Sequence, residues 1–140
     1  MNSRVRVDMD GPVARVCLTR PDQHNGMDFA MLDAVRRAAR RLRKDRRVRA
    51  VILHGEGPSF CAGLDVKSVL GNPAAAAVGL ASLFSPVRNR FQEWSMAWRE
   101  VAAPVIAAIH GNCFGAGLQL ALGADIRLVT PDARLSVMEV

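Results

Sequence analysis

Residues 104–126, with the sequence PVIAAIHGNCFGAGLQLALGADI, constrain the fold of this chain more than any other segment. An apolar strand runs into a turn built around glycines, and the turn opens an apolar helix. The first N–H groups of a helix have no partner inside it, and the helix dipole adds partial positive charge there. In a dry pocket, such a turn suits an oxygen atom that becomes negative during a reaction. A second glycine turn, SFCAGLD at residues 59–65, follows another apolar strand, so two turns could supply two donors to one oxygen.

The other apolar segments alternate between strand and helix patterns, which predicts an α/β fold. A β-hairpin is expected where Asp10 and Gly11 separate two segments that alternate apolar with polar residues. The patterns predict strands or extended segments over residues 5–8, 12–19, 48–54, 105–110, 126–130 and 134–138.

Helical patterns cover residues 29–44, 65–70, 73–101 and 116–122. Asp28 directly precedes the first of these segments and is suited to cap it. Pro86 is expected to end or kink the third segment. Trp94 and Trp98 lie four residues apart in that segment, so we expect both rings to face the core from one side of a helix.

The composition indicates one globular domain rather than a disordered or membrane-spanning chain. The chain has 140 residues, of which 50% are hydrophobic and 23% are charged. Pro and Gly interrupt every apolar run before it reaches membrane-spanning length, and the N-terminus lacks a signal-peptide core. A cytoplasmic protein that does not bind membranes is therefore the expectation.

Basic residues are concentrated between positions 36 and 49, which hold nine Lys or Arg and one Asp in a chain of net charge +6. Apolar residues recur at helical spacing over residues 29–42, which overlap the basic segment. This spacing favours an amphipathic helix whose basic face lies in solvent. Attraction of an anionic ligand or partner is the alternative. No aromatic residue interrupts the basic run, so nucleic-acid binding by base stacking is not expected.

Cysteine and histidine residues show no pattern of a metal site or a disulfide framework. The cysteines are Cys17, Cys61 and Cys113, and the histidines are His24, His54 and His110. We interpret all six as structural, because buried thiols behave mostly as small hydrophobic groups and the histidines lack ligand spacing. Ser59 lacks the surrounding glycines of a nucleophile elbow, and no phosphate-binding loop or dinucleotide fingerprint is present.

Four segments in order resemble the crotonase superfamily of enoyl-CoA hydratases and isomerases. These segments are residues 18–25, 59–65, 106–126 and 131–139. The resemblance implies a spiral of ββα units, of which residues 1–140 would form the N-terminal core as a single domain without its C-terminal part. It also implies an acyl-CoA thioester substrate of fatty acid metabolism, with no cofactor besides the CoA of the substrate. The full-length form would be a homo-oligomer, a trimer or a hexamer.

The resemblance also assigns site residues. Backbone N–H groups of Leu64 and Ala116 would hold the thioester oxygen, and Glu139 would be the catalytic base. Gln119 occupies a position where hydratases of the family carry a second carboxylate. The expected substrate and CoA contacts are Ala62, Leu64, Asp65, Val66, Lys67 and Gly115.

These assignments predict chemistry through an enolate. Removing the Cα proton of a thioester places negative charge on the carbonyl oxygen, which the two donors would stabilise. An amide at position 119 can orient water but cannot accept its proton, so isomerisation of a double bond by Glu139 alone is favoured over hydration. The alternative is a catalytically inactive acyl-CoA-binding or interaction module.

Overall fold

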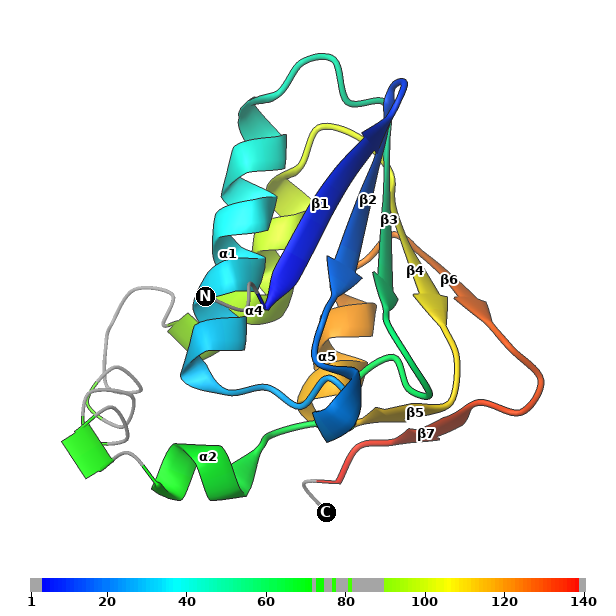
Figure 1. Ribbon diagram of the computed structural model, residues 1–140. Helices are drawn as coiled ribbons and strands as arrows, with labels where there is room; N and C mark the ends of the chain where they lie inside the picture. The colour runs from blue at the N-terminus through cyan, green and yellow to red at the C-terminus, as the bar shows by residue number, and fades with distance from the viewer. Residues whose placement is uncertain (1–3, 72, 75–76, 78–80, 82–89, 139–140) are drawn as a thin grey trace.

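The computed structural model describes residues 4–71, 73–74, 77, 81 and 90–138. A five-stranded sheet in the order β1-β2-β3-β4-β6 forms the centre of the fold (Figure 1). Its strands are β1 (Val5–Asp10), β2 (Val13–Leu18), β3 (Ala50–Gly55), β4 (Val105–Ile109) and β6 (Ile126–Val129). The β1–β2 pair is antiparallel, and the other three pairs are parallel. The predicted α/β class and the hairpin are therefore confirmed.

Helices pack against one face of this sheet (Figure 1). Helix α1 (Phe29–Lys44) begins and ends at the predicted residues. Asp28 caps it, since its side chain accepts a hydrogen bond of 2.7 Å from the Met31 amide. The apolar face of α1, which includes Leu32 and Val35, is buried against the sheet.

The basic face of α1 is partly neutralised by acidic residues of the helical segment that packs beside it. Arg36 and Arg40 both pair with Glu93, and Arg40 Nη2 lies 2.8 Å from a carboxylate oxygen of Glu93. Arg43 pairs with Glu100 at 2.6 Å. These ion pairs agree with the interpretation of the basic segment as a surface helix face.

Three further helical elements are α4 (Arg90–Met96), the 3-10 helix η2 (Ala97–Glu100) and α5 (Ala116–Leu122). Trp94 and Trp98 are each 1% exposed, so their predicted inward orientation is confirmed. Pro86 and its predicted effect lie outside the described residues. Among the described helices, none is long and apolar enough to cross a membrane.

A second, two-stranded parallel sheet lies near the carboxyl ends of the parallel strands (Figure 1). It pairs β5 (Asn112–Phe114) with β7 (Arg134–Ser136). The prediction that residues 112–114 belong to a turn is wrong. These residues form β5, which partners on both sides hold in extended form. One partner is β7, and the other is Cys61, which forms an isolated bridge with Cys113.

Several predicted boundaries require small corrections. The strand expected over residues 48–54 begins at Ala50, because the Val48 amide bonds to the Asp45 carbonyl in a turn. The 3-10 helix η1 (Pro21–Gln23) follows β2, and the short helix α2 (Val66–Leu70) directly follows the first glycine turn. The observed ends of the other strands differ from the predicted ones by one or two residues.

Candidate functional site

The two glycine turns are in direct contact. The Cys61 amide donates to the Asn112 carbonyl at 3.1 Å, and the Phe114 amide donates to the Cys61 carbonyl at 3.0 Å. Helix α5 approaches this bridge so closely that a Cβ atom on Gly117 would lie 2.2 Å from the Cys61 carbonyl oxygen. The segments 59–65 and 111–117, far apart in the sequence, therefore form one unit.

The first turn directs the Leu64 amide away from its neighbouring strand. The Met27 amide donates to the Gly63 carbonyl at 2.8 Å, and the Asp65 amide donates to the Met27 carbonyl at 2.9 Å. In this parallel bridge, the N–H and C=O of Leu64 itself point to the opposite side. Gly63 has a φ of +100°, a conformation that favours glycine.

The second turn places the Ala116 amide at the start of α5. Gly115, which precedes it, has a φ of +46°. Ala116 itself lies outside the positive-φ region, so its methyl group causes no backbone strain there. Its carbonyl accepts a 2.7 Å hydrogen bond from the indole Nε1 of Trp94, which fixes the first turn of the helix. Within the described residues, neither the Leu64 amide nor the Ala116 amide has a hydrogen-bond partner.

Leu64 and Ala116 both line one pocket with a volume of about 420 Å³. Of the predicted site residues, those that line this pocket are Ala62, Leu64, Val66, Gly115, Ala116 and Gln119. The structure thus places residues of both glycine turns and of α5 around one pocket. Glu139 lies outside the described residues, so its predicted role is untested.

Asp65 and Lys67 do not line the pocket, although both were predicted contacts. The Asp65 carboxylate caps α2 by accepting bonds from the Ser68 amide at 3.0 Å and the Ser68 hydroxyl at 2.6 Å. These bonds to Ser68, together with the guanidinium of Arg20, hold the pKa of the Asp65 carboxyl below its usual value. Lys67 lies on the exposed surface of α2 beside the pocket.

The sequence analysis missed four residues of the pocket lining, which are Met27, Gly63, Phe91 and Met138. Gly63 was detectable, since it precedes a predicted donor within a quoted motif. Met27 and Phe91 carried no such signal, because an apolar residue after a loop or on a helix is usually core. Phe91 is held by an edge-to-face contact with Phe29, with 6.3 Å between ring centroids.

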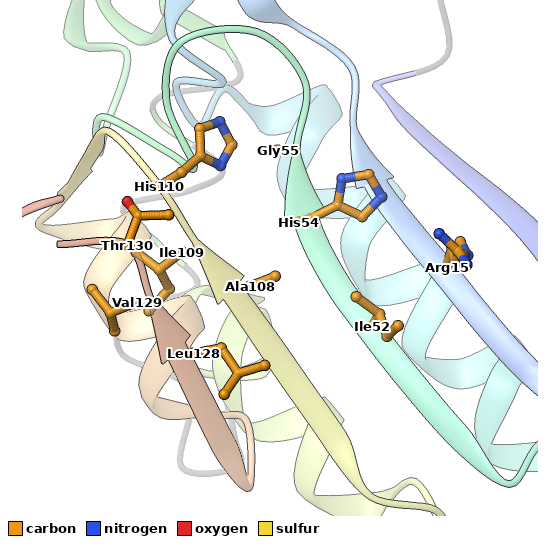
Figure 2. Close-up of a pocket in the computed structure, with 10 residues that line it drawn as sticks. All are labelled: Arg15, Ile52, His54, Gly55, Ala108, Ile109, His110, Leu128, Val129 and Thr130. Carbon is orange, nitrogen blue, oxygen red and sulfur yellow. The ribbon is translucent and has the colours of Figure 1, made fainter. Parts of the chain in front are cut away.

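A second hollow of about 430 Å³ lies on the exposed face of the central sheet and contains none of the predicted site residues (Figure 2). His54 and His110 lie near one end of it, and apolar side chains such as Leu128 occupy the other part. Burial lowers the pKa of His54, which favours its neutral form. His110 Nε2 lies 2.8 Å from the Gly57 carbonyl, which supports a structural role.

The cysteines near the turns are buried in apolar surroundings. Burial raises the pKa of Cys61 to about 12 and that of Cys113 to about 11, so both thiols are protonated at neutral pH. In the described part of the chain, no group of three His, Cys, Asp or Glu residues is arranged to hold a metal ion.

Comparison with known proteins identifies the class. Residues 8–140 match the family model described as enoyl-CoA hydratase/isomerase, and the chain belongs to this family. A protein named probable enoyl-CoA hydratase from Mycobacterium tuberculosis H37Rv is 36% identical over 129 residues. The mitochondrial Δ(3,5)-Δ(2,4)-dienoyl-CoA isomerase of Rattus norvegicus is 33% identical over 132 residues.

Solved structures confirm the crotonase-like fold. The crystal structure of an enoyl-CoA hydratase candidate from Streptomyces coelicolor A3(2) matches 94% of this chain with a TM-score of 0.81 and 36% identity. That of enoyl-CoA hydratase from Thermoplasma volcanium GSS1 matches 96% of it with a TM-score of 0.78 and 27% identity. The chain spans 47% and 51% of these two structures, and 48% and 40% of the two curated relatives.

Proposed function

We propose that this chain binds an acyl-CoA thioester in the pocket between the two glycine turns. The thioester carbonyl oxygen would accept hydrogen bonds from the amides of Leu64 and Ala116. One observation carries this proposal: Leu64 and Ala116 line the same pocket, each follows a positive-φ glycine, and the amide of each has no partner in the described residues. The apolar lining from Met27 and Phe91 suits an acyl chain.

The reaction we propose proceeds through an enolate. A base removes the Cα proton, and the electron pair of the C–H bond moves into the carbonyl group, where the oxygen becomes negative. Donors placed for that oxygen stabilise the charged state more than the neutral thioester, and one such donor typically contributes about 3 kcal/mol. Glu139 is the base we propose, on the strength of the resemblance.

Gln119 favours isomerisation over hydration. It lies on α5 and lines the pocket in which we propose that the thioester binds. Hydration needs one group to activate water and another to handle the Cα proton, and an amide cannot accept the proton of water. Moving a double bond needs only one carboxylate, which takes a proton at C2 and returns it at C4.

Deuterium exchange at Cα tests the proposed chemistry directly. Butyryl-CoA incubated in D₂O with the chain should gain deuterium at C2, whereas no exchange with any chain length tried would count against an enolate. The substitution Gln119→Glu should raise hydration of crotonyl-CoA if a second carboxylate is all that hydration lacks. Gln92→Glu, which adds the same charge on the exposed side of α4, is the matched control.

Binding without turnover is the second candidate function. The pocket residues and the two proposed donors would bind the thioester whether or not a base completes the reaction. Calorimetric binding of butyryl-CoA with no deuterium exchange would identify the chain as an acyl-CoA-binding module. The expectations of a trimer or hexamer, of a cytoplasmic location and of no cofactor besides CoA stay predictions.

A further inference from the structure

Arg20 is a nearly buried arginine at the edge of the first glycine turn. Its side chain is 12% exposed, and Nη1 lies 2.7 Å from a carboxylate oxygen of Asp65. The same Nη1 donates to the Gly26 carbonyl at 3.1 Å and lies 3.6 Å from the Asp28 carboxylate. Nη2 donates to the Ser68 hydroxyl at 3.2 Å. One guanidinium group therefore connects the loop before α1 with the start of α2.

The charges around Arg20 balance. Asp28 also accepts a 2.7 Å bond from Arg4, so two arginines face two carboxylates. Asp28 and Asp65 are only 11% and 10% exposed, and each also caps a helix. Such burial is tolerated because every charge has a partner, and removing one partner leaves the other unpaired at high cost.

The residues that Arg20 holds lie on both sides of the Met27–Leu64 bridge. Gly26 and Asp28 flank Met27 in the sequence, and Asp65 directly follows Leu64. The Leu64 side chain is 46% exposed and therefore contributes little packing that could fix its own peptide. The direction of the Leu64 N–H depends on the backbone around it. The guanidinium contacts the segments on both sides of the bridge, at Gly26 in one and at Asp65 in the other.

We propose that Arg20 is a positioning residue for the thioester site: it holds the Leu64 amide at the angle at which it can donate to the carbonyl oxygen. This inference rests on the proposed function and adds to it a residue that does not touch the substrate. An arginine is required because its two Nη groups reach different partners at once, Asp65 and Gly26 through Nη1 and Ser68 through Nη2, whereas a lysine offers one compact charge. Displacement of a donor by about 1 Å is enough to lose most of its effect on a reaction.

Two measurements on the full chain test the proposal. The first is the ¹³C signal of the carbonyl of [1-¹³C]butyryl-CoA, which moves downfield when donors polarise it. The second is hydrogen exchange at the amides of Met27 and Asp65, which make the two hydrogen bonds of the bridge. This exchange is measured without a ligand. The variants are Arg20→Gln and Arg20→Lys, and Arg47→Gln is the control because Arg47 forms a solvent-exposed ion pair with Asp45.

We expect wild-type chain and Arg47→Gln to shift the carbonyl signal downfield by the same amount. In Arg20→Gln most of this shift should be lost, and bridge amides should exchange about ten-fold faster, as for the loss of one hydrogen bond to a charged group. Arg20→Lys should keep only part of the carbonyl shift and only part of the exchange protection that the wild-type chain shows. Unchanged bridge exchange or a full carbonyl shift in Arg20→Gln would overturn the positioning role. A wild-type chain that leaves the signal in place would overturn the thioester function as well, whatever the exchange shows.

Discussion

Replacing Gly117 by alanine should separate the two glycine turns. The new Cβ atom would lie 2.2 Å from the carbonyl oxygen of Cys61 and 2.9 Å from its carbonyl carbon. Contacts between a carbon and a carbonyl oxygen normally begin at about 3.3 Å, so α5 has to retreat by about 1 Å. The neighbour is backbone in a buried bridge, so no side-chain rotation can relieve the contact.

The size of the effect follows from two opposing contributions. Alanine in a helix is favoured over glycine by about 1 kcal/mol, and φ at this position is compatible with alanine. Overpacking of a rigid interior costs typically about 1–3 kcal/mol, and the backbone contact at Gly117 places it at the upper end. We expect a net loss of about 2 kcal/mol in the free energy of unfolding.

Urea unfolding followed by tryptophan fluorescence measures this loss, since Trp94 bonds to the first turn of α5. The midpoint should fall by about 1 M for a slope of about 2 kcal/mol per molar. Gly71→Ala is the matched control, because its Cβ would lie 3.2 Å from the Lys67 carbonyl, a contact that a shift of a few tenths of an ångström relieves at the exposed end of α2. It should change the unfolding free energy by less than about 0.5 kcal/mol.

The same variant separates stability from function. If the folded variant keeps α5 displaced by about 1 Å, deuterium exchange at Cα of butyryl-CoA should fall by about 100-fold under conditions where the protein stays folded. An unchanged urea midpoint in Gly117→Ala would refute the reasoning about the close approach to Cys61. An unchanged exchange rate with a lowered midpoint would refute the placement of the Ala116 amide in the reaction.

Three further results are expected. The pKa of Asp65 is lowered in the folded state, so its contribution to stability is complete above the ordinary carboxyl pKa and is lost as pH falls below it. In Asp65→Asn, the urea midpoint should therefore decline less steeply between pH 5 and pH 3 than it does in the wild-type chain. Trp94→Phe leaves the Ala116 carbonyl without its indole donor and should cost about 1–3 kcal/mol by urea unfolding, whereas no change would mean that the bond is unimportant. Cys61 and Cys113 should resist iodoacetamide at pH 8 in the native chain and react in urea; rapid native labelling would contradict their raised pKa values.

The sequence predicted those elements whose ends are determined locally. Helix α1 starts one residue after Asp28, and the cap bond to Met31 explains why the first helical residue was predictable. Helix α5 lies between Gly115, with positive φ, and Gly123, so its limits were predictable from the glycines. In both cases the deciding interactions lie within a few residues of the boundary.

The elements that the sequence did not predict depend on distant partners. Strand β5 has only three residues, too few for an alternation pattern, and is extended because Cys61 and β7 pair with it. Arg20 lies in a segment of turn residues and was expected in a loop. Its side chain is nearly buried because it pairs with Asp28 and Asp65. The pocket residues Met27 and Phe91 likewise become part of a site only through tertiary packing.

The two proposed donors are held by different kinds of interaction, which should make them respond differently to solution conditions. The Leu64 amide depends on charges, because Arg20 and the Asp65 carboxylate fasten its bridge. The Ala116 amide depends on packing against Cys61 and on the neutral indole of Trp94, neither of which titrates near neutral pH. Acid that protonates Asp65 therefore loosens the first turn while the second keeps its place. Because the proposed reaction needs both donors on one oxygen, polarisation of a bound thioester should weaken before the chain unfolds.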